Sequence, residues 1–520
     1  MKRVDNLYKD IANFYSIYDM TNNVCTSVRN KKKVDKFETF KMEHVYHIYN
    51  KLYKKDFTVG KYNIFMISDP KCRIVMAQDI EDKIINHLVS KYALKCVFES
   101  KYTNSMCATR IGYGTLYGIK QLKIYLNKMK CKYNNFYILK LDISKYFYKI
   151  DHDILKSLIK EKIKDKNSLL LLDSIIDSTN SNYINKKIYE LKNNRIDYLK
   201  KCTINNKNKL IDEVESIPLY EYGKGVALGN ETSQAFGLIY LYKLNHYLKE
   251  NLHLKYVINY MDDFVIIHQD KEYLKRCLTI IINILKEDYK LDINKNKTRI
   301  DSIKNGIDFL GYRFFIRNNR TIMKLRNKTK KKYKRKIKKV RILYRNNQIN
   351  ENDFLIRLNS YNGILKWGSC GSLFYKKEVI IIIEKYYKYK SDYKDYVIFI
   401  KSGNFYECLS NDALIINNLL NYKVKRIGNT LKVGFPINNI SVVTSLLVNN
   451  NISYIVVDKD IIDKYNSNSN NYNCYYYDME KILFNYIRID KIIKYLEYNV
   501  LSNNMNDILN RIDEILKSYV

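Results

Sequence analysis

The sequence predicts an α+β protein of several domains. Its 520 residues are enough for about two to four domains, each with its own core. Short runs rich in Val, Ile, Tyr and Phe, which favour extended structure, alternate with longer segments whose apolar residues recur at helical spacing. Two such runs lie on either side of the acidic stretch Asn259–Phe264 and predict a β-hairpin.

This predicted hairpin carries two adjacent carboxylates, Asp262 and Asp263, between Tyr256–Ile258 and Val265–Ile267. Aspartates in a turn beside a rigid sheet suit Mg²⁺, because this hard cation prefers oxygen ligands and keeps sites for water and phosphate. Aspartate is also common in solvated turns. Taken alone, the pair therefore favours an ordinary acidic turn, and the rest of the chain must decide.

The chain is strongly basic. It has 91 Lys and Arg against 54 Asp and Glu, which gives a formal net charge of +37. Such a charge attracts polyanions and makes nucleic acid the first partner to consider. The abundance of Lys, Asn, Ile and Tyr, with 50 Tyr, is also what drift towards A+T-rich codons produces. The charge nevertheless acts electrostatically whatever its origin.

Cysteine usage and hydropathy restrict the protein class further. The 10 cysteines include no Cys-x-x-Cys pair, which argues against zinc and against a disulfide framework. The N-terminal residues lack the apolar core of a signal peptide, and no stretch approaches the roughly 18 apolar residues of a membrane span. We therefore expect a soluble, cytoplasmic protein without a membrane partner.

The first segment with distinct chemistry follows about 60 residues that are predicted to be helical. Ile64–Ile67 and Ile74–Met76 are two apolar runs that flank a turn with Lys71 and Arg73. They predict a hairpin whose cations either bind phosphate or form a solvated basic turn. After an amphipathic helix at residues 79–98, two glycines in the loop Thr109–Thr115 allow a close backbone approach.

A buried strand is predicted at Phe136–Leu141, and Asp142 lies at its end. This aspartate either caps the following helix or joins Asp262 and Asp263. In the second case the three carboxylates would hold two Mg²⁺ about 3.5 to 4 Å apart.

Residues 160–217 are predicted to be helical and carry no motif. The glycine-rich stretch Gly223–Gln234 then leads into an apolar helix at Ala235–Leu244, with Ser233 and Gln234 as hydrogen-bonding groups near the helix start. The glycine spacing is not that of a nucleoside-triphosphatase phosphate loop, so ATPase activity is not expected.

Beyond the hairpin, Leu291–Ile300 and Ile307–Phe314 are predicted as two short edge strands. The basic run Arg326–Lys339 then opens a helical segment that ends near Gly368. A run of charge is usually a solvated helix face. Here it would also suit a helix that lies along a phosphate backbone.

Taken in order, these stretches resemble the sequence blocks of reverse transcriptases over roughly residues 60 to 375. The resemblance depends on the order of the basic hairpin, the strand aspartate, the glycine-rich loop, Tyr260–Asp263, Lys297-Thr298 and Leu310–Tyr312. It implies a right-hand polymerase, with fingers and palm in residues 1–320 and a basic helical thumb in residues 321–388. Its substrates would be an RNA template, a primer or growing cDNA, and deoxynucleoside triphosphates. Its cofactor would be two Mg²⁺, with Mn²⁺ as a substitute.

The resemblance also assigns roles to residues. Asp142, Asp262 and Asp263 would be the catalytic, metal-binding carboxylates, and Lys297 would protonate the leaving pyrophosphate. Phe147 would exclude the ribose 2′-hydroxyl. The other residues expected to bind the nucleotide are Lys71, Arg73, Arg110, Ser233, Gln234 and Tyr260.

The block Leu228–Gln234 is similar to that of the reverse transcriptases of diversity-generating retroelements, whereas group II intron enzymes usually have Gln-Gly there. The thumb end Ser360–Trp367 also fits. This subfamily copies a template-repeat RNA into error-prone cDNA and works with a small basic accessory protein. The long segment between Asp142 and Gly223 departs from the pattern.

Residues 389–465 resemble the N-terminal mismatch-recognition domain of MutS, a small α/β module. The similar stretches are Tyr396–Glu407, Asp412-Ala413, Val433–Pro436 and Ser453–Asp458. The resemblance implies that Phe405 stacks into a mismatched base step and that Glu407 hydrogen-bonds a base. The alternative is an ordinary α/β domain with Phe405 in its core. Residues 466–520 are predicted to be a helical tail.

Two other functions remain open from the sequence. An antiphage defence reverse transcriptase would have the same motifs without a diversification target. A nucleic-acid-binding protein with a degenerate polymerase would explain the charge, but every expected carboxylate is present.

Overall fold

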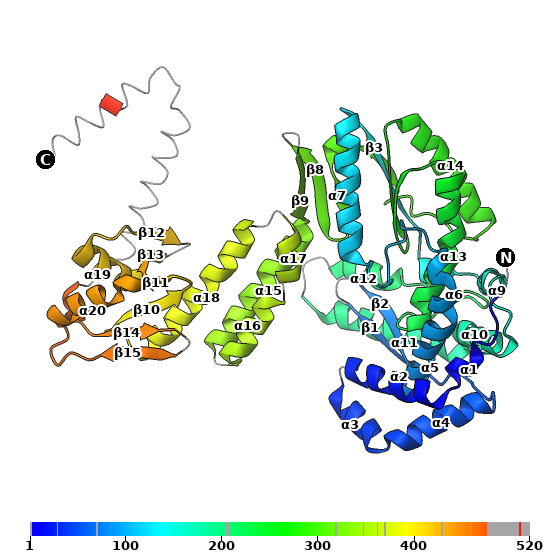
Figure 1. The fold of residues 1–520 in the computed structure, drawn as a ribbon, viewed down its shortest axis with the longest axis horizontal. Coiled ribbons are helices and arrows are strands. Elements are labelled where there is room, and N and C mark those ends of the chain that lie inside the picture. The colour runs from blue at the N-terminus through cyan, green and yellow to red at the C-terminus, as the bar shows by residue number, and fades with distance from the viewer. Residues whose placement is uncertain are drawn as a thin grey trace. The chain divides into compact units, whose positions relative to one another are not determined.

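The computed structural model describes residues 3–28, 30–68, 71–203, 207–317, 320–346, 348–360, 362–368, 371–427, 430–458, 460–475 and 509–510. The chain divides into two compact units, Met1–Met323 and Lys324–Val520 (Figure 1). Helices and strands occur in both units, so the predicted α+β class is confirmed. The division lies close to the predicted boundary between residues 1–320 and 321–388, whose functional meaning stays a prediction.

The first unit opens with a group of helices that share one large core with its sheet. The helix α2 begins at a typical N-cap, because the Asn13 side chain accepts hydrogen bonds from the backbone N–H groups of Tyr15 and Ser16. Its buried residues Ile17 and Val24 belong to the same core as Ile84 of α5. The helices of this part are α1 (Tyr8–Ile11), α2 (Phe14–Ser27), α3 (Lys31–Thr39), α4 (Lys41–Tyr53), α5 (Ile80–Val89) and α6 (Cys96–Phe98).

A four-stranded antiparallel sheet with the strand order β4-β5-β3-β6 forms the centre of this unit. Its strands are β3 (Tyr137–Asp142), β4 (Tyr256–Tyr260), β5 (Asp263–His268) and β6 (Arg299–Ser302). The helices α7 (Thr115–Lys132), α13 (Glu231–Glu250) and α14 (Lys271–Glu287) contact this sheet. The helix α13 is apolar on most sides and therefore lies within the core rather than on the surface.

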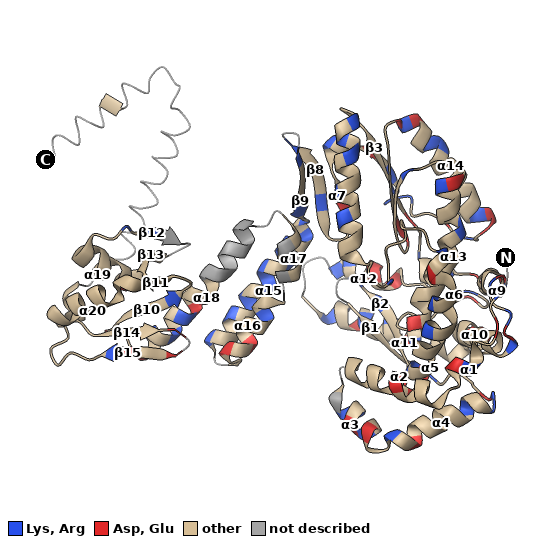
Figure 2. Ribbon diagram, viewed as in Figure 1, with Lys and Arg blue, Asp and Glu red and all other residues tan. Residues whose placement is uncertain are grey.

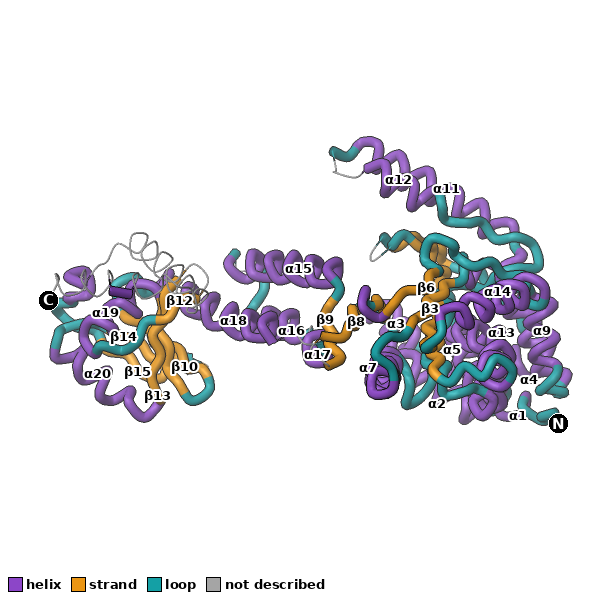
Figure 3. Tube along the Cα trace, turned by 90° about the horizontal axis from the view of Figure 1, so that it is seen from above, coloured by secondary structure: helices purple, strands orange, loops and turns teal. Residues whose placement is uncertain are grey.

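The segment without a motif is helical, as predicted. It forms α10 (Lys166–Asp177), α11 (Asn182–Lys201) and α12 (Lys207–Glu215), and the helices α8 (Tyr146–Lys149) and α9 (His152–Lys160) precede it. Ile184 and Ile188 of α11 pack against Ile64 and Ile74 of the hairpin β1 (Asn63–Ile67) and β2 (Arg73–Ala77). The helices α11 and α12 lie side by side (Figure 3).

The prediction of two edge strands after the central hairpin is wrong in its bounds. Within Leu291–Thr298 only an isolated antiparallel bridge forms, between Ile293 and Ile143, and it includes the hydrogen bond from the Asn294 N–H to the Asp142 carbonyl. The chain then turns, because the Asn294 carbonyl accepts from the N–H groups of Lys297 and Thr298. The second run is a hairpin, β7 (Ile307–Phe309) and β8 (Tyr312–Arg317), which β9 (Arg320–Leu325) extends. Its turn lies at Leu310 and Gly311, whose φ values of 44° and 90° are left-handed.

The second unit begins with four helices and continues into a six-stranded sheet. The helices are α15 (Asn327–Arg345), α16 (Glu351–Asn359), α17 (Asn362–Trp367) and α18 (Gly371–Asp392). The strand order is β12-β13-β11-β10-β14-β15, and only the pair β10–β14 is parallel among the described pairs. The strands are β10 (Val397–Ser402), β11 (Phe405–Leu409), β12 (Lys425–Ile427), β13 (Thr430–Pro436), β14 (Tyr454–Val457) and β15 (Ile461–Tyr465).

The sheet of the second unit is covered on both faces. One face packs with α19 (Ser410–Leu420) and α20 (Ile440–Asn449) around Phe399 and Phe435. The other face packs with α18 through Ile398, Ile400 and Val457. Most of the predicted helical tail, residues 476–508 and 511–520, lies outside the described residues. None of the helices in the described ranges combines the length and apolar character that a membrane span needs.

Candidate active site

The two hairpin aspartates lie where β4 meets β5. The register pairs Tyr260 with Asp263, which leaves Met261 and Asp262 as a two-residue turn. Met261 has a φ of 57°, a left-handed conformation that costs a side-chain-bearing residue about 1–2 kcal/mol. The Met261 side chain is 8% exposed, so packing offsets this strain. The turn thus holds Asp262 at a tightly defined position.

Strand β3 brings the third carboxylate to this turn. Asp142 pairs directly with Asp263 in the antiparallel register, so the two side chains share one face of the sheet. The backbone N–H of Ile143 donates to the carbonyl oxygen of Asp262 at 3.0 Å, which attaches the end of β3 to the turn. The structure therefore brings together the three aspartates that the sequence analysis singled out.

Burial and the neighbouring negative charges disfavour the charged forms of Asp262 and Asp263. Burial raises the pKa of Asp262, and the negative charge of Asp142 raises it further, against the cations Lys297 and Arg73. Burial also raises the pKa of Asp263 to about 6, although Lys140 favours its charged form. A divalent cation among these groups would remove the repulsion.

Two lysines neutralise part of this charge. The Lys297 Nζ lies 2.7 and 2.8 Å from the two carboxylate oxygens of Asp142. The Lys140 Nζ lies 3.3 Å from Asp263 Oδ2 and donates to the carbonyl of Asp308 in β7 at 2.8 Å. The sequence analysis missed Lys140. Its signal was its position two residues before Asp142 in a strand, which puts both side chains on the same face.

The donor set fits Mg²⁺, which prefers carboxylate oxygens. Asp263 Oδ1 is buried and has no hydrogen-bond partner among the described residues, so a strong acceptor is left over. Over the described ranges, however, no group of three or more His, Cys, Asp or Glu side chains is arranged to hold an ion. Lys297 and Lys140 lie against oxygens of Asp142 and Asp263, respectively.

Phe147 and Tyr260 lie close to the aspartate turn. A Cβ added at Gly237 of α13 would lie 3.2 Å from the Phe147 ring and 3.5 Å from Met261 Sδ, so both side chains reach the same spot on α13. The Phe147 ring is half-buried. The Tyr260 hydroxyl lies 3.2 Å from that of Thr115.

The predicted basic hairpin is confirmed as β1–β2, and Lys71 and Arg73 are exposed on it. Its tip residues Asp69 and Pro70 lie outside the described residues. The positive charge of Arg73 acts to lower the pKa of Asp262, so this guanidinium lies within electrostatic range of the aspartate turn.

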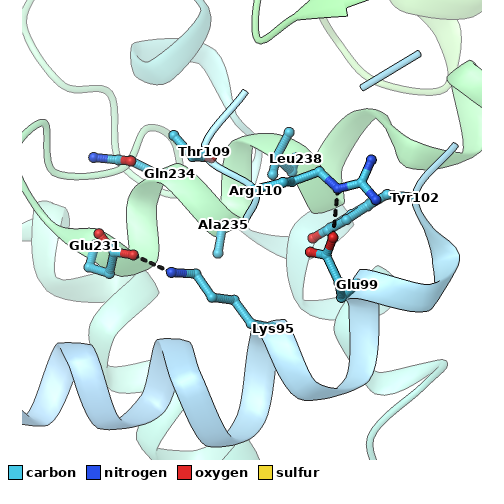
Figure 4. Close-up of a pocket in the computed structure, with 9 residues that line it drawn as sticks. All are labelled: Lys95, Glu99, Tyr102, Thr109, Arg110, Glu231, Gln234, Ala235 and Leu238. Carbon is cyan, nitrogen blue, oxygen red and sulfur yellow. Dashed lines mark hydrogen bonds and ion pairs between the residues drawn. The ribbon is translucent and has the colours of Figure 1, made fainter. Parts of the chain in front are cut away.

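Two residues that are expected to contact the nucleotide, Arg110 and Ser233, make hydrogen bonds within the protein. The Arg110 side chain is 5% exposed, and its guanidinium donates to Glu99 at 2.8 Å and to two backbone carbonyls at 2.9 Å (Figure 4). The buried Ser233 hydroxyl donates to the Ala227 carbonyl at 2.7 Å. Gln234 lines the same cavity as Arg110 (Figure 4), but this cavity of about 10 Å³ admits at most one water.

The glycine-rich loop has a packing role. Gly229 has a φ of 129°, and a Cβ there would lie 2.8 Å from the Met76 carbonyl oxygen in β2. The Met76 N–H in turn donates to the Leu228 carbonyl at 2.8 Å. Beside this loop lies a cavity of about 410 Å³, which includes Lys33 and Lys83 in its lining. The absence of a side chain at Gly229 therefore allows the loop to approach the neighbouring strand β2 closely.

A second candidate site lies at the start of β11. Phe405 is 48% exposed, so the alternative that it is a core residue is wrong. Glu407 is 8% exposed on the same face, and its Oε1 lies 2.6 Å from the Lys432 Nζ. Its Oε2 is buried and has no hydrogen-bond partner in the described part of the chain. Of the expected pair, only the aromatic ring is open to solvent.

Comparison with known families and proteins agrees with this geometry. Residues 52–314, just over half of the chain, match the family model described as reverse transcriptase (RNA-dependent DNA polymerase). Residues 382–470 match the model of MutS domain I. The putative COX1/OXI3 intron 2 protein of Saccharomyces cerevisiae is 24% identical over 281 residues, which cover 49% of this chain and 31% of that protein. The matched part therefore spans less than a third of this relative.

Two solved structures are also similar. Apo telomerase from Candida tropicalis, truncated from its C-terminal domain, has 16% identity and a TM-score of 0.32, over 51% of this chain and 55% of that one. Telomerase from Candida albicans, in complex with a fragment of telomeric RNA, has 12% identity and a TM-score of 0.32, over 66% and 62%. Scores this low carry no argument about the fold.

Proposed function

Because this chain belongs to the reverse transcriptase (RNA-dependent DNA polymerase) family, we propose that it extends a DNA primer on an RNA template from deoxynucleoside triphosphates. The observation that carries the proposal is the placement of Asp142, Asp262 and Asp263 at one end of a four-stranded sheet. The raised pKa values of Asp262 and Asp263 and the unpartnered Asp263 Oδ1 support a cation-binding role.

In this proposal, the three aspartates hold divalent cations, which reverse transcriptase domains generally use. Such ions activate the primer 3′-hydroxyl and stabilise the charge of the triphosphate and leaving group. Arg73 attracts the triphosphate, and its electrostatic reach to Asp262 supports that role. Lys297 leaves Asp142 and protonates pyrophosphate. Its ammonium already lies beside the carboxylates.

The half-buried Phe147 is proposed to close the space beside the sugar, so that a ribose 2′-hydroxyl does not fit. Its contact with the spot on α13 that Met261 also reaches supports a position next to the aspartate turn. Residues 1–320 would be fingers and palm, and residues 321–388 the thumb. The exposed lysines of α15 (Figure 2) support a thumb that lies along a phosphate backbone.

The subfamily proposed is that of diversity-generating retroelements, on the basis of the block Leu228–Gln234. The cDNA would then be error-prone, and a small basic accessory protein would be a partner. An antiphage defence role is the alternative. A template/variable repeat pair beside the gene would favour diversification, and a defence island without such a pair would favour immunity.

The C-terminal sheet is proposed to bind mismatched or distorted duplex. Its match to MutS domain I and the exposed ring of Phe405 support this. Exchange of Phe405 for alanine should abolish the preference for mismatched over matched duplex in a binding assay at fixed salt. An unchanged preference in F405A would exclude the ring as the wedge.

Primer extension on an RNA template tests the polymerase. We expect Mg²⁺-dependent extension that is lost, by at least about a hundredfold, in the double variant Asp262→Ala/Asp263→Ala. Withholding each dNTP in turn reports fidelity, and frequent misinsertion opposite template adenine would favour the diversity-generating type. Failure to extend even with cognate RNA and accessory protein would support the alternative of a non-catalytic nucleic-acid-binding protein.

A further inference from the structure

Helix α18 is shared by two parts of the second unit. In Figures 1 and 3 it lies between the helices α15 and α16 and the six-stranded sheet. One side of α18 carries Glu384, which faces α15, and another carries Tyr386, which faces the sheet. Its contacts on each side decide whether it is a flexible linker or a rigid connection.

The contact with α15 is a buried ion-pair cluster. The Glu384 side chain is 1% exposed and lies 2.6 Å from the guanidinium groups of both Arg341 and Arg345. Arg345 also donates through Nη2 to the second oxygen at 2.9 Å, so its contact with the carboxylate is bidentate. Bidentate geometry fixes orientation as well as distance. The basic helix is therefore held in one position on α18.

The contact with the sheet is an apolar core with a buried polar centre. Ile382, Ile383 and Tyr386 of α18 pack with Ile398 and Ile400 of β10. The Tyr386 hydroxyl donates to Asp412 Oδ2 at 2.9 Å. The fully buried Asp412 also accepts from Lys390 of α18 at 2.7 Å and from the Ile398 N–H at 3.0 Å. Groups satisfied this completely leave α18 little freedom to move relative to the sheet.

Phe405 lies on the face of the sheet that α18 covers. Ile400, which belongs to the core shared with α18, pairs with Glu407, and Ser402 pairs with Phe405. Because strand side chains alternate between faces, Glu407 and Phe405 point to the same face as Ile400. Phe405 is one step beyond the covered pair, and this explains its exposure.

We propose that α15, α18 and the six-stranded sheet form one rigid arm, which presents the α15 lysines and the Phe405 ring to a single nucleic-acid duplex at a fixed separation. This inference rests on the proposed polymerase and mismatch-binding functions. The exposed cations on α15 include Lys328, Lys330, Lys331, Lys334, Arg335 and Lys338. They hold phosphates of any sequence, while the ring selects a step weakened by mispairing. The partner is the duplex product of the polymerase, and a mismatch is recognised at one distance from the phosphates that α15 holds.

The test measures how fast the full-length protein dissociates from primer–template duplexes, at fixed salt and without dNTPs. A single mismatch is moved one base pair at a time away from a short run of charged phosphates, and the phosphates elsewhere in the duplex are replaced by uncharged methylphosphonates. We expect one position at which dissociation slows by at least about fivefold, the lower end of what one base–aromatic stack contributes. Phe405→Ala should abolish this slowing at every position.

Two variants weaken the contacts of α18 with α15 and with the sheet, respectively. If one variant fails to fold, the other still tests the proposal. Glu384→Gln weakens the contact with α15, and Tyr386→Phe removes one hydrogen bond to the sheet. Each should spread the slowing over several mismatch positions without abolishing it. Arg357→Gln, at an exposed position on α16, is the matched control and should behave as the unsubstituted protein.

The outcomes separate this inference from the functions on which it rests. Mismatch-dependent slowing that is equal at all positions would overturn the rigid arm and leave mismatch binding intact. If no mismatch position slowed dissociation, both the rigid arm and the mismatch binding would be overturned. Because no nucleotide is incorporated in this assay, a failure of polymerase activity would not affect either result.

Discussion

At the scale of single residues, the negative charge of the three aspartates is reduced in two ways, by ion pairs with lysines and by raised pKa values. Lys297 is paired with Asp142 and Lys140 with Asp263, while burial raises the pKa values of Asp262 and Asp263. The lysines limit the repulsion among the carboxylates in the metal-free chain.

The raised pKa of Asp263 predicts a pH-dependent stability in the metal-free protein. Burial raises this pKa from 3.8 to about 6, so folding favours the protonated form. The stabilising contribution is fully present below the unfolded pKa and is lost as pH rises through about 6, which amounts to up to about 3 kcal/mol. Denaturant unfolding of the protein and of Asp263→Asn between pH 4 and 7 measures the difference. Equal pH profiles for the two proteins would contradict the prediction.

Phe147 is predicted to set sugar selectivity. Replacement by valine opens the space that the ring fills and should improve ribonucleotide over deoxyribonucleotide use by about 10- to 100-fold, the range of a steric pocket change. The readout is the ratio of kcat/KM values for the two substrate types in primer extension. Phe147→Tyr retains the ring and is the matched control. If the ratio of kcat/KM values were unchanged in Phe147→Val, the ring would only pack against α13 and would not select the sugar.

At the scale of elements, strand pairing assembles the site from distant segments. The β3–β5 register puts Asp142 opposite Asp263, and the β4–β5 turn carries Asp262. Lys140 connects this centre to the β7–β8 hairpin through the Asp308 carbonyl. The glycine-rich loop attaches the β1–β2 hairpin to α13, because Gly229 and Leu228 both contact Met76 of β2.

Gly229 is predicted to be intolerant of a side chain. An alanine Cβ would lie 2.8 Å from a backbone oxygen in a conformation with a φ of 129°, so Gly229→Ala should destabilise the protein by about 1–3 kcal/mol. Denaturant unfolding measures this. Gly363→Ala is the matched control, since it meets nothing within 4 Å and lies in helix α17. An equal effect of the two substitutions would contradict the steric argument.

At the scale of the whole molecule, the net charge of +37 dominates non-specific binding to nucleic acid. The basic residues of α15 lie opposite its buried face, which carries Tyr333, Ile337 and Tyr344. This amphipathic pattern directs the charge outwards and packs the helix into the second unit. Affinity for nucleic acid should therefore fall steeply with salt.

The salt dependence predicts how many phosphates α15 contacts. Lys334→Gln/Lys338→Gln removes two exposed charges one helical turn apart and should reduce the slope of log K against log salt concentration by about 2. Matched and mismatched duplexes should lose affinity equally. Lys187→Gln/Lys275→Gln removes two lysines that already form helix-local ion pairs, and its slope should not change. A slope unaffected by the α15 substitutions would exclude this helix from the phosphate contacts.

The sequence by itself determined the local features of this protein. The Asp262–Asp263 turn, the β3 strand and the β1–β2 hairpin were predictable, because period-two alternation and turn residues act over a few positions. The strand predicted at Leu291–Ile300 was wrong in its bounds, because the turn at residues 294–298 limits pairing before it to an isolated bridge at Ile293, and β6 begins only at Arg299.

Only the tertiary structure decided which side chains meet. It buried Arg110 against Glu99, paired Lys140 with Asp263, exposed Phe405, and connected α15 to the sheet through Glu384. Each of these contacts joins residues whose approach depends on strand register and helix packing. A local sequence pattern carries no information about such partners. The contacts between them stabilise the protein only when distant segments are buried together.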